Sequence, residues 1–233
     1  MGNITNVFGV MASSYLREDK HWGSDLDFLK TSLDSATRAG DDDVTYLDVG
    51  CGPGFHLHAM RDFYPRAYIL GIDPCDEMIE EAAEKARLRG LHVNLLRTGV
   101  MQFREETHDV VSCLNNTLGN LRERGLRPSV TRERAVRKMR TLVREGGPLI
   151  VSVYNLETLE LKQDYGSNLR ILKKSNVEAG DLYVQYRHAG GLTEYYSHWF
   201  TRAELIELLR HGGFKVELLE ERMARLVVRA RAV

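Results

Sequence analysis

Apolar residues in the first part of the chain recur every three or four positions, which is the spacing of an amphipathic helix. The recurring positions are Val7, Met11, Tyr15, Leu26, Leu29 and Leu33. Gly40 and the acidic residues 41–43 end this pattern. We therefore expect residues 1–43 to form an N-terminal helical cap.

From residue 44 the pattern changes to short apolar runs that alternate with amphipathic segments. The expected strands are residues 44–49, 67–73, 92–97, 109–114 and 148–154. The expected helices are residues 53–64, 76–89 and 129–145. Regular alternation of strand and helix predicts a doubly wound α/β fold with a parallel sheet covered on both faces, here over residues 44–155.

After residue 155 the alternation stops. Three strands are expected at residues 169–175, 182–188 and 193–200, and the glycines between them favour antiparallel hairpins. Residues 156–200 are therefore interpreted as a small β insertion that could act as a lid over a substrate. A helix at 202–211, with Thr201 as its N-cap, and strands at 214–219 and 224–230 return residues 201–233 to the core.

Composition narrows the class of protein. The 233 residues suffice for one large α/β domain, and 32 Lys and Arg nearly balance 33 Asp and Glu, giving a net charge of −1. No apolar run is long enough to span a bilayer, so a membrane protein is not expected. The three cysteines lack the C-x-x-C spacing of a zinc site, so we expect no metal and reduced thiols in a cytoplasmic protein.

Residues 122–144 are rich in arginine and allow two interpretations. Arg132, Arg134 and Arg137 could bind RNA phosphates or an acidic partner. Alternatively, they form the solvated face of an outer helix. We favour the solvated face, because no stacking motif or added RNA-binding domain accompanies the segment, so nucleic acid is disfavoured as a partner.

A glycine-rich turn follows the first expected strand, with Gly50, Gly52 and Gly54 in G-x-G-x-G spacing. The dinucleotide-binding pattern is G-x-G-x-x-G, and its third glycine would fall at position 55, where this chain has Phe55. We expect Pro53 at the first position of the following helix, where it removes an N–H that a pyrophosphate would use. NAD is therefore disfavoured, and the absence of a Walker lysine disfavours ATP.

Asp73 ends the second expected strand, 23 residues after Gly50. At that place in a doubly wound sheet, a carboxylate can accept hydrogen bonds from both ribose hydroxyls. A turn without phosphate-binding features and a ribose-binding acid together indicate a nucleoside ligand.

The motifs at residues 47–54, 71–78, 109–116 and 143–150 resemble those of class I S-adenosylmethionine-dependent methyltransferases. The resemblance implies a Rossmann-like sheet of seven strands in the order 3-2-1-4-5-7-6, with strand seven antiparallel. It also implies S-adenosyl-L-methionine as cofactor and S-adenosyl-L-homocysteine as product.

The same resemblance assigns cofactor-binding residues. The methionine part would lie against Asp48, Gly50, Gly52 and Gly54, with Tyr15 at its carboxylate. Asp73 would hold the ribose, Pro74 and Met78 would flank the adenine, and Leu114 and Asn115 would lie beside the sulfonium. The family's third motif is Gly-Asp, whereas this chain has Gly99-Val100. Either backbone atoms of Gly99, Val100 and Met101 contact the adenine instead, or the adenine is held less tightly.

Polar and aromatic residues after the fourth and fifth strands and in the insertion are candidates for the acceptor site. They are Asn116, Tyr154, Asn155, Tyr195 and Trp199. His198 is the candidate general base, because an imidazole titrates near neutral pH, and Asn116 is a second candidate catalytic residue. The alternative is that alternate residues of this strand pack on a sheet.

The sequence thus predicts transfer of a methyl group from S-adenosylmethionine to nitrogen, oxygen or carbon of a small-molecule acceptor. Two alternatives stay open: a methyltransferase acting on RNA or protein, and a non-catalytic regulator that binds the cofactor. The sequence does not determine the oligomeric state, and a homodimer is possible.

Overall fold

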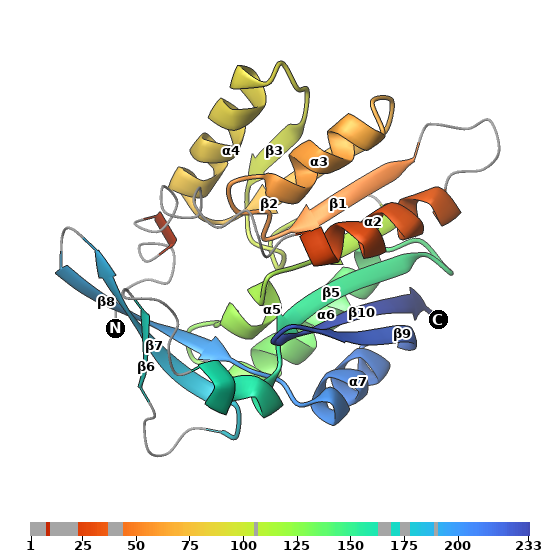
Figure 1. Cartoon of the computed structure of the whole chain (residues 1–233). Helices are drawn as coiled ribbons and strands as arrows, with labels where there is room; N and C mark the ends of the chain where they lie inside the picture. The colour runs from red at the N-terminus through yellow and green to blue at the C-terminus, as the bar shows by residue number, and fades with distance from the viewer. Residues whose placement is uncertain are drawn as a thin grey trace.

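The structure is a computed structural model that describes residues 8–9, 23–36, 44–104, 107–162, 169–172, 178–188 and 191–233. Its centre is a seven-stranded sheet in the order β3-β2-β1-β4-β5-β10-β9 (Figure 1). The strands are β1 (Thr45–Val49), β2 (Tyr68–Asp73), β3 (Asn94–Arg97), β4 (Val110–Cys113), β5 (Pro148–Tyr154), β9 (Phe214–Arg222) and β10 (Arg225–Ala232). Strands β1 to β5 are parallel, whereas β10 is antiparallel to both of its neighbours. This is the predicted seven-strand order, and the fold class is confirmed.

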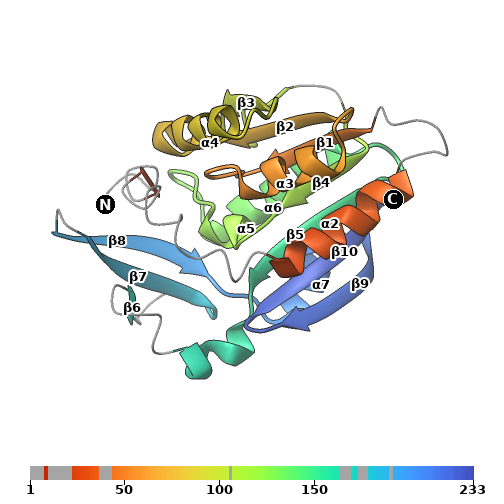
Figure 2. The same cartoon turned by 45° about the horizontal axis from the view of Figure 1, so that its top comes forward.

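Helices cover both faces of this sheet (Figures 1 and 2). One face carries α2 (Gly23–Ala36), α3 (Phe55–Phe63) and α4 (Asp76–Leu88). The other carries α6 (Pro128–Leu142) and α7 (Arg202–His211), with the short α5 (Thr117–Asn120) at the end of β4. From residue 44 on, the predicted helices and strands are present with shifted ends, whereas α5 and the 3₁₀ helix η3 (Leu156–Lys162) were not predicted. Before residue 44, most of the expected helical region lies outside the described residues.

Helix α2 is the longest described piece of the expected N-terminal cap. Phe28, Leu29 and Leu33 repeat at helical spacing and are buried against the sheet beside α3. In its described part, this region is therefore a layer of the core rather than a cap over the ends of the strands.

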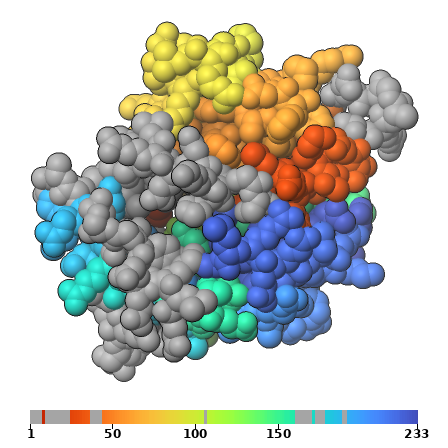
Figure 3. Space-filling model, in the orientation of Figure 1, coloured from red at the N-terminus to blue at the C-terminus, as the bar shows by residue number. Residues whose placement is uncertain are grey.

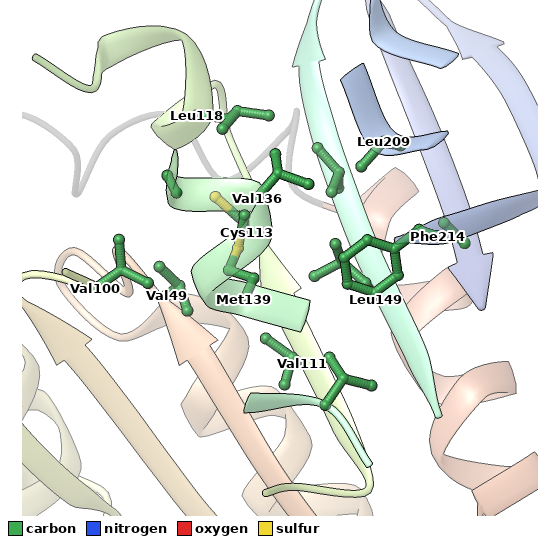
Figure 4. Close-up of a cluster of buried hydrophobic side chains, with 14 of the residues drawn as sticks. Val49, Val100, Val111, Cys113, Leu118, Val136, Met139, Leu149, Leu209 and Phe214 are labelled. Atoms are coloured by element: carbon green, nitrogen blue, oxygen red, sulfur yellow. The ribbon is translucent and has the colours of Figure 1, made fainter. Parts of the chain in front are cut away.

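The larger hydrophobic cluster lies between the sheet and the α6–α7 layer (Figure 4). Val111 and Leu149 project from neighbouring parallel strands, and Val136 and Met139 of α6 pack against them. Each of these side chains is fully buried, which stabilises the fold by about 1.5–3 kcal/mol per residue relative to an exposed position. This packing fixes the parallel strands whose carboxyl ends carry the predicted cofactor motifs.

A second sheet of three antiparallel strands lies beyond the carboxyl ends of the parallel strands (Figures 1 and 2). It consists of β6 (Leu169–Leu172), β7 (Asp181–His188) and β8 (Gly191–His198). Paired residues share a face, so Leu182 and Ser197 point to one side while Asp181 and His198 point to the other. The expected antiparallel β insertion is therefore present.

In the space-filling view, the yellow surface around α4 lies at the top, and the blue surface of the C-terminal strands lies in the lower half, next to the red surface of α2 (Figure 3). Within the described ranges, no helix is both long and apolar enough to cross a membrane.

Candidate functional site

The turn between β1 and α3 contains three glycines with positive φ angles. These angles are 72° at Gly50, 52° at Gly52 and 81° at Gly54, a region that side chains rarely adopt. Because Gly54 is left-handed, the helix begins only after it, at Phe55. Pro53 therefore lies in the turn before the helix, and its expected place at the first helical position is wrong.

Two of these glycines serve different purposes. A Cβ atom at Gly50 would overlap the Thr117 side chain of α5, so this glycine is required for packing. A Cβ atom at Gly52 would meet only the Met78 sulfur at 3.8 Å among the described residues. The backbone at Gly52 thus borders space that a ligand can enter.

Asp73, at the end of β2, lies directly beside this turn. Its carboxylate accepts hydrogen bonds from the Gly52 N–H over 3.1 Å and from the Cys75 N–H over 2.9 Å. Burial raises the pKa of Asp73, while these two backbone donors partly offset that effect. The structure therefore brings the glycine turn and the acidic strand end together, as the sequence predicted.

Asp48 lies beneath the turn and is buried. The Ser112 hydroxyl donates to its Oδ1 over 2.5 Å, and the Tyr46 hydroxyl lies 2.8 Å from the same serine oxygen. The pKa of Asp48 is raised to about 7: burial is the largest cause, the negative charges of Asp73 and Asp25 add to it, and the Ser112 hydrogen bond acts against it. A ligand cation beside Asp48 would favour its ionised form.

The remaining predicted cofactor residues surround the same edge of the sheet. Met78 is buried beside Cys75 and Phe8, whereas Pro74 is exposed. Val100 and Leu114 are buried, and Gly99, Met101 and Asn115 are partly exposed. Tyr15 lies outside the described residues.

Asn115 and Asn116 form a turn after β4, and both have left-handed backbone angles, 51° and 61° in φ. The Asn115 N–H donates to the Ser152 hydroxyl over 2.9 Å. Its side-chain oxygen accepts from Arg225 Nη1 over 2.8 Å. Non-glycine residues in this conformation store strain that the surrounding contacts must hold.

Sequence reasoning missed the residues that support this turn. Asp25 of α2 accepts hydrogen bonds from the Ser152 hydroxyl over 2.7 Å and from Arg225 Nη1 over 3.0 Å. These three residues lie on α2, β5 and β10, far apart in the sequence. No local motif links them, so only the folded chain reveals the cluster.

Asn116 is fully buried and joins three parts of the fold. Its side-chain nitrogen donates to the Ser197 hydroxyl of β8 over 3.0 Å, and its side-chain oxygen accepts from the Tyr154 N–H over 3.1 Å. Both ends of the amide thus have protein partners, which supports a structural role at the site. Its predicted catalytic role gains no support from this geometry.

His198 has both ring nitrogens in hydrogen bonds to carboxylates. Nδ1 lies 2.6 Å from Asp181 Oδ1, and Nε2 lies 2.7 Å from Glu204 Oε1. The side chain is 1% exposed. Sequence reasoning expected a base that is open to an acceptor, whereas this ring would first have to leave a carboxylate.

The other predicted acceptor residues divide into buried and accessible positions. Asn155 is buried, and its side-chain oxygen accepts from the Glu157 N–H over 3.0 Å, so it caps the start of η3. Trp199 is also buried, with its ring centroid 5.1 Å from that of Tyr154. Tyr195 is partly exposed and lies 5.8 Å, ring to ring, from Phe8. Tyr154 and Tyr195 are therefore the better placed of the predicted acceptor residues.

The arginine-rich segment only partly forms the solvated face that the sequence predicted. Arg134 pairs with Glu123 on the surface. Arg132, however, is 2% exposed and donates to the Tyr196 hydroxyl over 2.6 Å. The interpretation of Arg132 as a solvated residue is wrong, because β8 of the insertion packs over this part of α6.

Comparison with known proteins agrees with this architecture. Residues 47–147 match the model of a family described as a methyltransferase domain. No curated protein sequence is a significant match. Similar solved structures include an S-adenosylmethionine-dependent methyltransferase from Clostridium acetobutylicum ATCC 824, at 18% identity, a TM-score of 0.69 and 99% coverage of each chain.

Two other similar structures are methyltransferases whose names refer to sugars. An amino pentose methyltransferase from Micromonospora echinaspora, bound to S-adenosylmethionine, is 19% identical, with a TM-score of 0.62 and 95% coverage of each chain. A sugar N-methyltransferase from Streptoalloteichus sp ATCC 53650 is 18% identical, with a TM-score of 0.64 and coverage of 100% of this chain and 94% of that one.

The sheet order, the glycine turn and the acidic end of β2 define a class I methyltransferase fold. With the domain match at residues 47–147, they confirm the resemblance that the motifs gave. Residues 47–147 thus match a methyltransferase domain, and the chain has the fold of S-adenosylmethionine-dependent methyltransferases.

Proposed function

We propose that this enzyme transfers a methyl group from S-adenosylmethionine to nitrogen, oxygen or carbon of a small-molecule acceptor. The observation that carries the proposal is the position of Asp73, whose carboxylate is held by the backbone of the glycine turn at the end of β2. This is where a parallel sheet of this kind binds the ribose of a nucleoside.

The charge of the site suits a cationic cofactor. Asp48 and Asp73 are carboxylates in largely buried surroundings, and burial raises the pKa of each. S-adenosylmethionine carries a sulfonium and an ammonium group, which would offset the electrostatic cost of ionising these carboxylates. The bound cofactor supplies an activated methyl group.

The protein's own residues position the reactants and exclude water. The Asn115-Asn116 turn holds one wall of the site at the end of β4, and the small sheet with Tyr195 holds another. Methyl transfer is an in-line displacement that needs the acceptor atom at roughly 3–3.5 Å from the methyl carbon. Fixed walls on both sides favour such a geometry because they restrict the acceptor's orientation.

Small molecules are favoured as acceptors by two observations. Two similar structures are methyltransferases for an amino pentose and for a sugar nitrogen. Three of the four arginines of α6 are engaged within the protein, because Arg132 is buried and Arg134 and Arg140 are paired with Glu123 and Glu145.

The first test is calorimetric binding of S-adenosylhomocysteine to the wild type and to Asp73→Ala. Loss of two hydrogen bonds to a charged group predicts an affinity at least roughly 100-fold lower. Asp62→Ala is the matched control, because Asp62 is exposed and pairs with Arg89 on the surface. Equal affinities of Asp73→Ala and the wild type would contradict the placement of the ribose.

The second test is transfer of labelled methyl into host extract separated into small-molecule, RNA and protein fractions. We expect label in the small-molecule fraction with the wild type and none with Asp73→Ala. Label in RNA or protein would support the alternative acceptors instead. Binding without label in any fraction would support a non-catalytic regulator.

A further inference from the structure

A cluster of charged and polar side chains, partly buried, lies where the small sheet meets α6 and α7. Its members are Arg132, Glu178, Asp181, Tyr196, His198 and Glu204. Asp181 opens β7 and His198 closes β8, and the two residues are paired in the sheet. The cluster therefore occupies the root of the small sheet, at its connection to the core.

The geometry at His198 determines its protonation state. A neutral imidazole has one donor and one acceptor nitrogen, whereas an ionised carboxylate can only accept. Both nitrogens face carboxylate oxygens, at 2.6 Å from Asp181 and 2.7 Å from Glu204. Both hydrogen bonds can form together only when the ring carries two protons, as an imidazolium.

We propose that His198 is a positioning residue for methyl transfer: as an imidazolium, it clamps β7 and α7 together and thereby holds the Asn115-Asn116 turn in place. This inference rests on the proposed function of the same site. His198 contacts neither the cofactor-binding turn nor Asp73, so its effect passes through other residues.

Direct contacts connect the clamp to the turn. Ser197, the neighbour of His198, accepts a hydrogen bond from the Asn116 side chain over 3.0 Å. Gly119 of α5 lies against both residues, since a Cβ atom there would overlap the His198 carbonyl and lie 2.6 Å from the Asn116 amide atoms. No side chain separates the end of β8 from Asn116, so a shift of β8 must move the turn.

The charged groups around the ring favour the imidazolium. Burial lowers the pKa of His198, but the hydrogen bonds to Asp181 and Glu204 raise it by more, and the net pKa lies above the ordinary value near 6.5. The Arg132 charge acts in the opposite direction. Glu178 pairs with Arg132 at 3.6 Å, and the Tyr196 hydroxyl donates to Asp181 over 2.5 Å.

Loss of the proton at alkaline pH would open one side of the clamp. A neutral ring that keeps its hydrogen bond to the buried Asp181 would face Glu204 with a lone pair. Glu204 has 36% of its side chain exposed, so it can turn toward water. The tie between β8 and α7 is then lost, and the stabilisation of the Asn115-Asn116 turn decreases with it.

The decisive variant is Glu204→Gln. A glutamine amide can donate to the lone pair of a neutral Nε2, so both hydrogen bonds survive deprotonation of His198. Glu207→Gln is the matched control, because Glu207 lies on the same helix, is exposed and pairs with Arg210. NMR titration of labelled histidine should show a charged His198 at pH 7 in the wild type, and a pKa lower by about one unit or more in Glu204→Gln.

The functional measurement is the rate of labelled methyl transfer into the small-molecule fraction between pH 6 and 10, at varied S-adenosylmethionine concentration. We expect the maximal rate of the wild type and of Glu207→Gln to fall at alkaline pH, and by a larger factor than KM for the cofactor rises. Glu204→Gln should retain its rate across this range. Ser197→Ala should lower the maximal rate roughly tenfold and weaken its alkaline decline, because it breaks the link to Asn116.

Three results would overturn the inference. The first is a neutral His198 at pH 7 in the wild type. The second is a pH profile of Glu204→Gln that superimposes on that of the wild type while label is transferred. The third is a wild type that binds S-adenosylhomocysteine but transfers no label, in which case the proposed function fails together with the positioning role.

Discussion

Arg225 and Asn115 are 110 positions apart in the sequence, yet Arg225 Nη1 donates a hydrogen bond to the Asn115 side chain over 2.8 Å. The same nitrogen donates to Asp25 over 3.0 Å. One guanidinium therefore ties the start of α2 and the start of β10 to the turn after β4. Since Asp25 and Arg225 are both buried, solvent screens their ion pair only weakly.

Arg225→Met should destabilise the protein strongly, because it leaves the Asp25 carboxylate buried without its cationic partner. The expected loss in free energy of unfolding is about 3–5 kcal/mol, measured by urea denaturation. Arg231→Met, on the same strand but in an exposed pair with Glu217, should cost about 1 kcal/mol or less. Adding Asp25→Asn to Arg225→Met should recover part of the loss, and a double variant no more stable than Arg225→Met would contradict this account.

The raised pKa of Asp48, about 7, predicts a pH-dependent stability. Well below pH 3.8, the ordinary pKa of an aspartate, the carboxyl is protonated in both the folded and the unfolded chain. As the pH rises from 4 to 7, the unfolded chain loses this proton while the folded chain keeps it, so stability is lost across that window. Asp48→Asn lacks this penalty and should be more stable than the wild type at pH 8 by about 2–4 kcal/mol.

Thermal unfolding between pH 4 and 8 measures this difference without cofactor. The gap in Tm between Asp48→Asn and the wild type should widen up to pH 7 and then level off. Asp62→Asn, at an exposed site, should follow the wild type. A constant gap across the series would show that Asp48 does not titrate in this range.

The two glycines of the turn should respond differently to alanine. Gly50→Ala overlaps Thr117 and should lower the stability by about 2–4 kcal/mol. Among the described residues, Gly52→Ala meets only Met78 and should cost about 1 kcal/mol, from its positive φ, while reducing S-adenosylhomocysteine affinity roughly tenfold or more. Denaturation measures the loss of stability, and calorimetry measures the loss of S-adenosylhomocysteine affinity. If the ratio of these two losses is the same in both variants, Gly52 does not border the space that the ligand occupies.

Local patterns in the sequence predicted the fold well. The apolar runs at β1, β2 and β5 are bounded by glycine or charged residues, and the turn and Asp73 lie in consecutive strand–turn–helix units. These signals depend on residues that are only a few positions apart, so they can be read from the sequence directly. The start of α3 was misplaced because Pro53 suits a first helical turn, whereas the left-handed Gly54 prevents the helix from starting there.

The candidate site was harder to predict where it depends on distant residues. His198 has the side chain of a general base, but Asp181 and Glu204 occupy both of its nitrogens. Arg132 belongs to a basic segment, but the insertion buries it. In each case the identity of the residue was visible in the sequence, whereas its partners come from segments that only the fold brings together.

The alternation of side chains along β7 and β8 divides the small sheet into two independent surfaces. Asp181 and His198 lie on the face that anchors the sheet, while Val184 and Tyr195 share the opposite face with Ser197. Substitutions at positions 184 and 195 would therefore reshape that second face without breaking the anchoring bonds. If the small sheet borders the acceptor as proposed, such a division would allow acceptor preference to be redesigned while the attachment of the insertion is kept.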